Sequence, residues 1–130
     1  MKKLIILISI VFLSCHYQKD KLKVFNKSSI DIHYLPMVYD LDRNYYLALS
    51  VGSNIRQGEH NSPYLRGTIS ECLKQKEFDG FLYIVYFEEK YFKYASENEK
   101  KIIYDKRFKV QKYPLKQLDS LNWTITYDGN

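Results

Sequence analysis

The amino-acid sequence predicts an α+β fold, with a small mixed or antiparallel sheet of about five strands and two or three short helices packed on it. Segments in which apolar and polar residues alternate, as in strands, come first along the chain, and segments with helical spacing come later. Strands that precede the helices in this way are typical of α+β folds rather than of repeated βαβ units.

Two strands are expected at the start of the fold. Leu22–Phe25 and Ile30–Tyr34 alternate between apolar and polar residues, and the polar cluster Asn26–Ser29 separates them. This pattern predicts a β-hairpin, and Pro36 is expected to end its second strand. The predicted buried face consists of Leu22, Val24, Ile30, Ile32 and Tyr34.

Two more strands are expected in the middle of the chain. Tyr45–Val51 is aromatic and aliphatic, and a polar loop over Arg56–Pro63 follows it. Phe81–Phe87 is a continuous apolar and aromatic run, which is typical of a central strand covered on both faces.

Capping patterns predict two short helices. Thr68 and Glu71 have the spacing of a capping box, which would begin a helix over Ile69–Lys76. Ser96–Glu99 has the same spacing and would begin a second helix that runs to Tyr104.

A third helix and a last strand are expected at the C-terminus. Pro114 suits the first helical position, where its missing N–H is not needed, and Asn122 is expected to end the helix. Trp123–Tyr127 then alternates as a strand. The apolar positions of the helix are Leu115, Leu118 and Leu121, and those of the strand are Trp123, Ile125 and Tyr127.

The N-terminus has the pattern of a bacterial lipoprotein signal. Lys2 and Lys3 precede the apolar run Leu4–Leu13, which is about ten residues long and too short to span about 30 Å of hydrocarbon. Phe12-Leu13-Ser14-Cys15 resembles a lipobox, in which Phe12 takes the place where leucine is commonest. The resemblance implies cleavage before Cys15 and lipidation of its thiol. An ordinary secretory signal with an incidental cysteine is the alternative.

Three segments follow from this interpretation: a signal peptide over residues 1–14, a lipidated cysteine with a polar tether over 15–21, and a single α+β domain over 22–130. The protein is expected on the bacterial envelope, in the outer membrane, on its periplasmic or outer face. Gln18-Lys19-Asp20 is similar to a fragment of a surface-export signal, and a plain solvated spacer is the alternative.

Composition narrows the classes of function. The chain has 130 residues and a net charge of +5, and cleavage after Ser14 leaves 116 residues and +3, because two lysines leave with the signal. Such a small charge, spread along the chain, does not form the clustered basic patch of a nucleic-acid-binding protein. No nucleic-acid partner is therefore expected. If Cys15 carries lipid, Cys72 has no disulfide partner and is expected on a buried helix face.

The C-terminal half resembles a family. Phe81–Phe87, Ile102–Phe108 and Pro114–Tyr127 are similar to the ends of small uncharacterised lipoproteins of Bacteroidota, which close on a leucine-rich helix and Asn-Trp-x-Ile-x-Tyr. Their N-terminal hairpin also resembles the segment around Asn26–Ser29. The resemblance supports a lipoprotein and implies no activity.

No catalytic, cofactor or metal site is expected. His16, His33 and His60 lack partners at metal-ligand spacing and are expected to be solvated, and a tertiary cluster of His33, His60 and an acidic residue is the alternative. Asp40–Asn44 begins like a calcium loop, but glycine and glutamate are missing from its sixth and twelfth positions. Glu88-Glu89 point to opposite sides of a strand end and do not form an acid–base pair.

The tyrosines are the remaining candidates for binding. Tyr45 and Tyr46, and Tyr91 and Tyr94, form local aromatic clusters that could contact a ligand or a partner, and packing into the core is the alternative. We therefore expect a membrane-anchored, non-enzymatic protein that contacts another envelope protein. The alternative is a module that binds a glycan or small ligand through exposed tyrosines.

Overall fold

The computed structural model describes residues 21–65 and 67–130, and it confirms the α+β class. In these residues, eight strands form two sheets of three and five strands, and the three α-helices are small beside them. The signal peptide, Cys15 and the tether up to Asp20 lie outside the described residues.

The larger sheet is antiparallel throughout. Its order is β3 (Tyr45–Ala48), β2 (Ile32–Asp40), β6 (Phe81–Phe87) and β7 (Lys109–Pro114). A further strand, β4 (Ser53–Ile55), pairs with the first part of β2, whereas β3 pairs with its last part.

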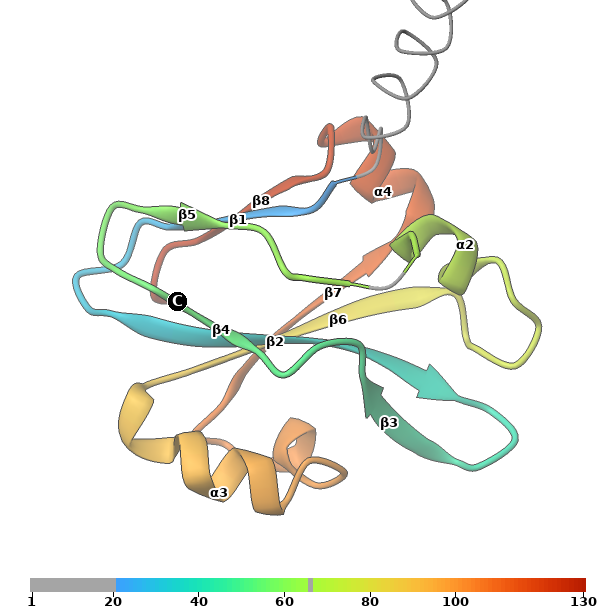
Figure 1. Cartoon of the computed structure of the whole chain (residues 1–130), viewed down its shortest axis with the longest axis horizontal. Coiled ribbons are helices and arrows are strands. Elements are labelled where there is room, and N and C mark those ends of the chain that lie inside the picture. The colour runs from blue at the N-terminus through green and yellow to red at the C-terminus, as the bar shows by residue number, and fades with distance from the viewer. Residues whose placement is uncertain (1–20, 66) are drawn as a thin grey trace, which may run out of the picture.

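The smaller sheet joins the two ends of the domain. Its central strand β1 (Lys23–Asn26) pairs in parallel with β8 (Thr124–Tyr127) and antiparallel with β5 (His60–Asn61). In Figure 1 this sheet lies across the top of the molecule, with β2 and β6 below it.

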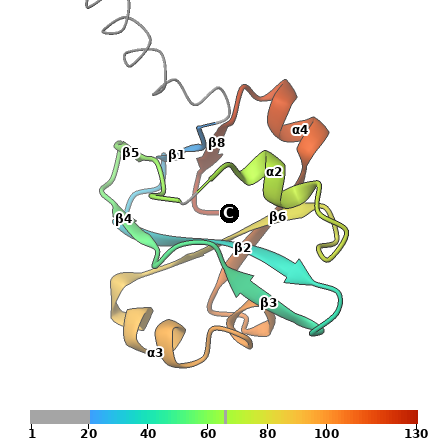
Figure 2. The same cartoon turned by 45° about the vertical axis from the view of Figure 1, so that its right-hand side comes forward.

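The elements form three layers (Figures 1 and 2). On one face of the larger sheet lie the smaller sheet, α2 (Ile69–Leu73) and α4 (Leu115–Ser120). On the other face lie α3 (Phe92–Glu97) and the 3₁₀ turn η3 (Ile102–Tyr104). A second 3₁₀ turn, η2 over Glu89–Tyr91, links β6 to α3.

The central strand prediction is confirmed by β6. Leu82, Ile84 and Tyr86 point into the core shared with the smaller sheet, and Tyr83 and Val85 point into the core under α3. All five side chains are buried. Because both faces of the strand are covered, its sequence reads as an unbroken apolar run.

The predicted N-terminal hairpin is wrong. The strands β1 and β2 do not pair, and Ile30, expected in the buried face, is 45% exposed. The buried Asn26 side chain donates to the carbonyls of Ile30 and Ile55, at 2.7 and 3.0 Å. These bonds hold the chain where it passes from the smaller sheet to the larger one. Alternation predicted that each segment contains a strand, but it contains no information on which strands pair.

The expected end of a strand at Pro36 is also wrong, since β2 continues to Asp40. The Pro36 carbonyl accepts a hydrogen bond from the Leu49 N–H, on the side of β2 that faces β3 and β4. The proline nitrogen faces the same side of β2, at a position between the end of β3 and the start of β4. A missing N–H costs no ladder bond at such a gap.

Helix boundaries differ from the prediction. The cap at Thr68 is confirmed, because its hydroxyl accepts from the Glu71 N–H at 3.2 Å, although α2 ends at Leu73. The expected helix from Ser96 to Tyr104 is wrong: α3 begins earlier and ends at Glu97, and the Ser96 hydroxyl donates to a carbonyl within the helix.

Near the C-terminus, Pro114 is the N-cap of α4 rather than its first residue. Asn122 and Trp123 both have positive φ, 51° and 57°, so the last strand begins at Thr124. The strands β4, β5 and β7 lie in segments for which no strand was predicted.

Candidate functional site

Two hollows adjoin each other between the edge strand β3 and the helix α3. The first, of about 400 Å³, is called the tyrosine hollow and is lined by Tyr45, Tyr46, Leu47, Ser96, Glu97, Asn98, Glu99, Lys100 and Lys101. The second, of about 450 Å³, is called the apolar hollow and is lined by Leu35, Ala48, Leu49, Ser50, Val51, Phe87, Phe92, Ala95, Ser96 and Glu99. Ser96 and Glu99 belong to both.

Glu99 marks the boundary between the hollows. Its Oε1 accepts a hydrogen bond from the backbone N–H of Ala48 at 2.9 Å. The carboxylate therefore ties the segment after α3 to the outer edge of β3. Fifty-one positions separate the two residues in the sequence, and no local pattern predicted their contact.

Tyr45 presents its ring to a lysine. The Lys100 Nζ lies 4.1 Å from the ring centroid, and the Tyr45 hydroxyl accepts from Arg43 at 3.3 Å. The ring face already holds an ammonium group, which is the geometry of a cation–π contact.

Tyr46 is packed among other aromatic rings. Its ring centroid lies 4.8 Å from that of Tyr39, 5.0 Å from that of Tyr83 and 5.9 Å from that of Tyr104. Burial raises the pKa of the Tyr46 hydroxyl, so it stays protonated near neutral pH. Tyr46 therefore provides a rigid wall of the tyrosine hollow and a neutral hydroxyl.

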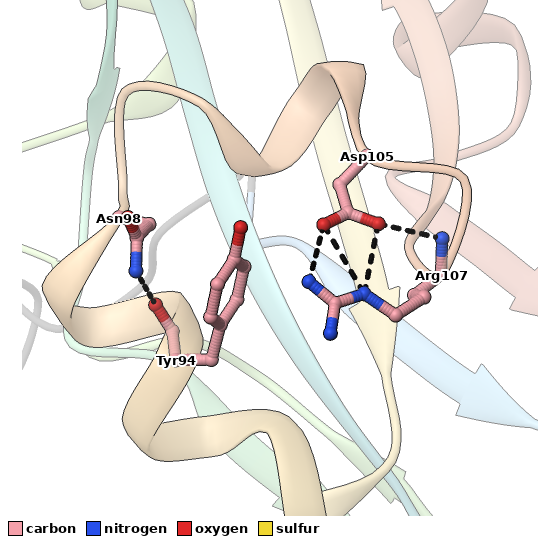
Figure 3. Close-up of polar contacts among 4 residues, drawn as sticks. All are labelled: Tyr94, Asn98, Asp105 and Arg107. Carbon is pink, nitrogen blue, oxygen red and sulfur yellow. Dashed lines mark hydrogen bonds and ion pairs between the residues drawn. The ribbon is translucent and has the colours of Figure 1, made fainter.

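Tyr91 and Tyr94 do not line either hollow. The Arg107 guanidinium carbon lies 5.3 Å from the ring centroid of Tyr91 and 4.4 Å from that of Tyr94. Asp105 binds the same guanidinium, with contacts from 2.6 to 3.2 Å (Figure 3). These bonds lower the pKa of Asp105 to about 2. This cluster braces the segment between α3 and β7, and Asn98 adds a bond to the Tyr94 carbonyl (Figure 3).

The four tyrosines predicted as contact residues thus separate into two pairs. Tyr45 and Tyr46 meet at a hollow with polar groups, whereas Tyr91 and Tyr94 pack on Arg107 and Phe108. The basic residues of this region also lie apart, because Lys100 and Lys101 line the tyrosine hollow and Arg107 is bound to Asp105.

The histidines of the domain do not line these hollows, although His33 packs on Phe87 and Phe92 of the apolar hollow. His33, expected to be solvated, stacks 5.7 Å from Phe87 and 5.1 Å from Phe92, and both of its ring nitrogens are buried without a partner in the described structure. Burial lowers its pKa, and the charge of Glu89 opposes that shift. His60 stacks on Phe25 at 4.9 Å.

Other groups with possible chemistry have structural partners. Asp40 accepts from the Arg43 N–H at 2.8 Å, so the motif that begins like a calcium loop forms a turn. Cys72 is half-buried on α2, and burial raises the pKa of its thiol. Among residues 21–65 and 67–130, no group of three histidine, cysteine or acidic side chains is placed to hold a metal ion.

The chain was compared with known proteins in three ways. Protein-family models, curated proteins and solved structures each contained no match to it. In the described part of the chain, every helix is too short or too polar to cross a membrane.

Proposed function

We propose that this chain is a lipid-anchored, non-enzymatic protein of the bacterial envelope that binds a neutral polar ligand, such as a glycan, in the tyrosine hollow. The observation that carries the ligand proposal is the lining of that hollow, where two tyrosines from β3 meet polar side chains from the end of α3 and the segment after it. Small-molecule sites combine apolar or aromatic walls with a few convergent polar groups in this way.

The charges of the hollow favour a neutral ligand. Glu97 and Glu99 balance Lys100 and Lys101, so the lining has no net charge but offers both donors and acceptors. A polyhydroxylated ligand uses both kinds of group, and its C–H faces can pack on tyrosine rings. Lys100 has to move from the ring of Tyr45 for a sugar to stack there.

The anchor would leave this hollow accessible. Lys21 is six positions after Cys15, so the start of the domain lies within about 20 Å of the lipidated residue. The strand β1 begins beside β8, where Lys23 N–H donates to the Trp123 carbonyl, and α3 lies at the opposite end of the molecule (Figures 1 and 2). The hollows beside α3 would therefore face away from the membrane.

Ligand binding is tested by screening the detergent-extracted protein on an array of neutral glycans and measuring the affinity of those retained. We expect Tyr45→Ala to weaken binding by about tenfold, because an aromatic contact contributes about 0.5–1.5 kcal/mol beyond its buried area. Tyr64→Ala is the matched control, since Tyr64 is 90% exposed and lines neither hollow. If no glycan is retained, or both variants bind alike, the tyrosine hollow is not a glycan site.

The anchor is tested separately by labelling cells with radioactive palmitate. We expect the natural chain to be labelled and to sediment with membranes, because several acyl chains on Cys15 give stable attachment. Cys15→Ser should lose the label, whereas Cys72→Ser should keep it. A natural chain that takes up no label contradicts lipidation, and membership of a Bacteroidota lipoprotein family would lose its main support.

Contact with another envelope protein is a second candidate. The apolar hollow favours it, since Val51 and Phe92 on its lining are 91% and 44% exposed. Exposed apolar groups of this kind gather at protein interfaces. We expect Val51→Asp to reduce co-purification of neighbouring envelope proteins with the detergent-extracted chain, and Tyr64→Ala to leave it unchanged.

A further inference from the structure

The outer edge of β3 presents backbone groups to the hollows. Leu49 N–H donates to Pro36 on the neighbouring strand, and Ala48 N–H points the other way, to Glu99. Since backbone groups alternate sides along a strand, those of Tyr46 share the outward direction of Ala48. In the sheet order, β3 is the terminal strand on this side.

Protection of this edge comes from outside the strand. Natural proteins block an edge with lysine, proline, bulges or a covering segment, because an open edge is a template for another strand. Tyr45–Ala48 contains no charged residue and no proline. The only capping bond described at this edge comes from the Glu99 carboxylate, which occupies one outward N–H.

We infer that the β3 edge is a self-association surface, and that Glu99 determines how strongly it pairs with a second copy of this chain. Antiparallel pairing about a two-fold axis at Leu47 would place Tyr46 of one copy opposite Ala48 of the other. Both residues direct their backbone groups outward, so each such pair would form two hydrogen bonds.

The positions of the two hollows along β3 favour a second copy of this chain as the partner of the β3 edge. The tyrosine hollow adjoins the start of β3 and the apolar hollow adjoins its end. An antiparallel pair brings the start of one strand to the end of the other. The aromatic lining of each copy would therefore meet the apolar hollow of its partner, where Leu49 and Val51 lie.

The test is the self-association of the detergent-extracted full chain by sedimentation and by disulfide cross-linking at Leu47→Cys in a Cys72→Ser background. Residues on a two-fold axis between antiparallel strands lie within disulfide range. We expect Glu99→Ala to strengthen dimerisation by at least about tenfold, which corresponds to about 1.4 kcal/mol. Glu99→Asp keeps the charge but shortens the side chain, and it should also strengthen dimerisation.

Two controls isolate the edge. Glu97→Ala removes a neighbouring carboxylate that does not bond Ala48, and it should associate like the natural chain. Val110→Cys places the thiol on β7, at the opposite edge of the sheet, and should not cross-link. Circular dichroism checks that each variant is folded. Equal association of the natural chain, Glu97→Ala and both Glu99 variants overturns the inference, as does cross-linking at position 110 that matches that at 47.

Discussion

At the scale of single residues, buried polar side chains hold the layers together. The side chain of the fully buried Asn26 donates to two carbonyls and accepts from the N–H and hydroxyl of Ser28, so all four of its hydrogen-bonding positions are used. His33 is the opposite case, since its ring nitrogens are buried without a partner in the described structure. Proteins seldom leave buried polar groups unpaired, because the lost hydration is not replaced.

His33 should make stability depend on pH. Burial favours the neutral ring, so its pKa in the folded state lies below the ordinary value of 6.5. As the pH falls below that value, the unfolded chain takes up a proton before the folded one does, and stability is lost. We expect the free energy of unfolding, measured with urea, to fall between pH 7.5 and pH 5, and to fall less in His33→Phe.

The matched control for this measurement is His60→Phe, which changes an exposed histidine on β5 and should keep the pH dependence of the natural chain. The charged group that faces His33 is Glu89, and its carboxylate reduces the effect without reversing it. If His33→Phe and the natural chain lose the same stability on acidification, other groups are responsible.

At the scale of elements, local patterns predicted whether a long segment forms a strand or a helix better than they predicted which elements it packs against. Phe81–Phe87 was predicted with the observed bounds, because an apolar run with aromatic and β-branched residues is unlike any helical pattern. The helix expected over Ser96–Tyr104 is absent because Ser96 lies near the end of α3 instead of before it. A capping box is a weak signal without a helical face behind it, and Ile102 and Ile103 alone do not supply one.

The Thr68 cap is an element whose contribution can be measured. The hydroxyl satisfies the Glu71 N–H, one of the donors that a helix leaves unpaired at its start. We expect Thr68→Ala to lower the free energy of unfolding by about 1 kcal/mol, and Thr68→Ser, which keeps the hydroxyl, to lower it much less. Equal losses in the two variants would mean that the threonine methyl group, not the cap, stabilises α2.

At the scale of the whole molecule, the parallel pair β1–β8 joins the start of the domain to its end. Four residue pairs connect the strands, from Lys23 with Thr124 to Asn26 with Tyr127. Ile125 and Tyr127 also bury their side chains in the core between the two sheets. The last strand therefore closes a layer that no earlier part of the chain completes.

Removal of that strand should unfold the domain. Deleting residues 124–130 removes two buried side chains, at about 2–5 kcal/mol each, from a domain whose total stability is expected to be about 5–15 kcal/mol. We expect the loss of a cooperative thermal transition and of near-ultraviolet circular dichroism. Deleting only residues 128–130, which are exposed, should leave both signals close to those of the natural chain. A cooperative transition in the longer deletion would show that β1 does not need β8.

The sequence by itself determined the α+β class, the central strand and the cap at Thr68, because these depend on neighbours within a few positions. It also predicted a lipidated Cys15, which lies outside the described residues and stays a prediction. Only the tertiary structure decided that Tyr45 and Tyr46 line a hollow while Tyr91 and Tyr94 pack on Arg107. Only it placed Glu99 against Ala48. Such contacts join segments far apart in the chain, and a periodic pattern tells which face of an element is buried but not which other element covers it.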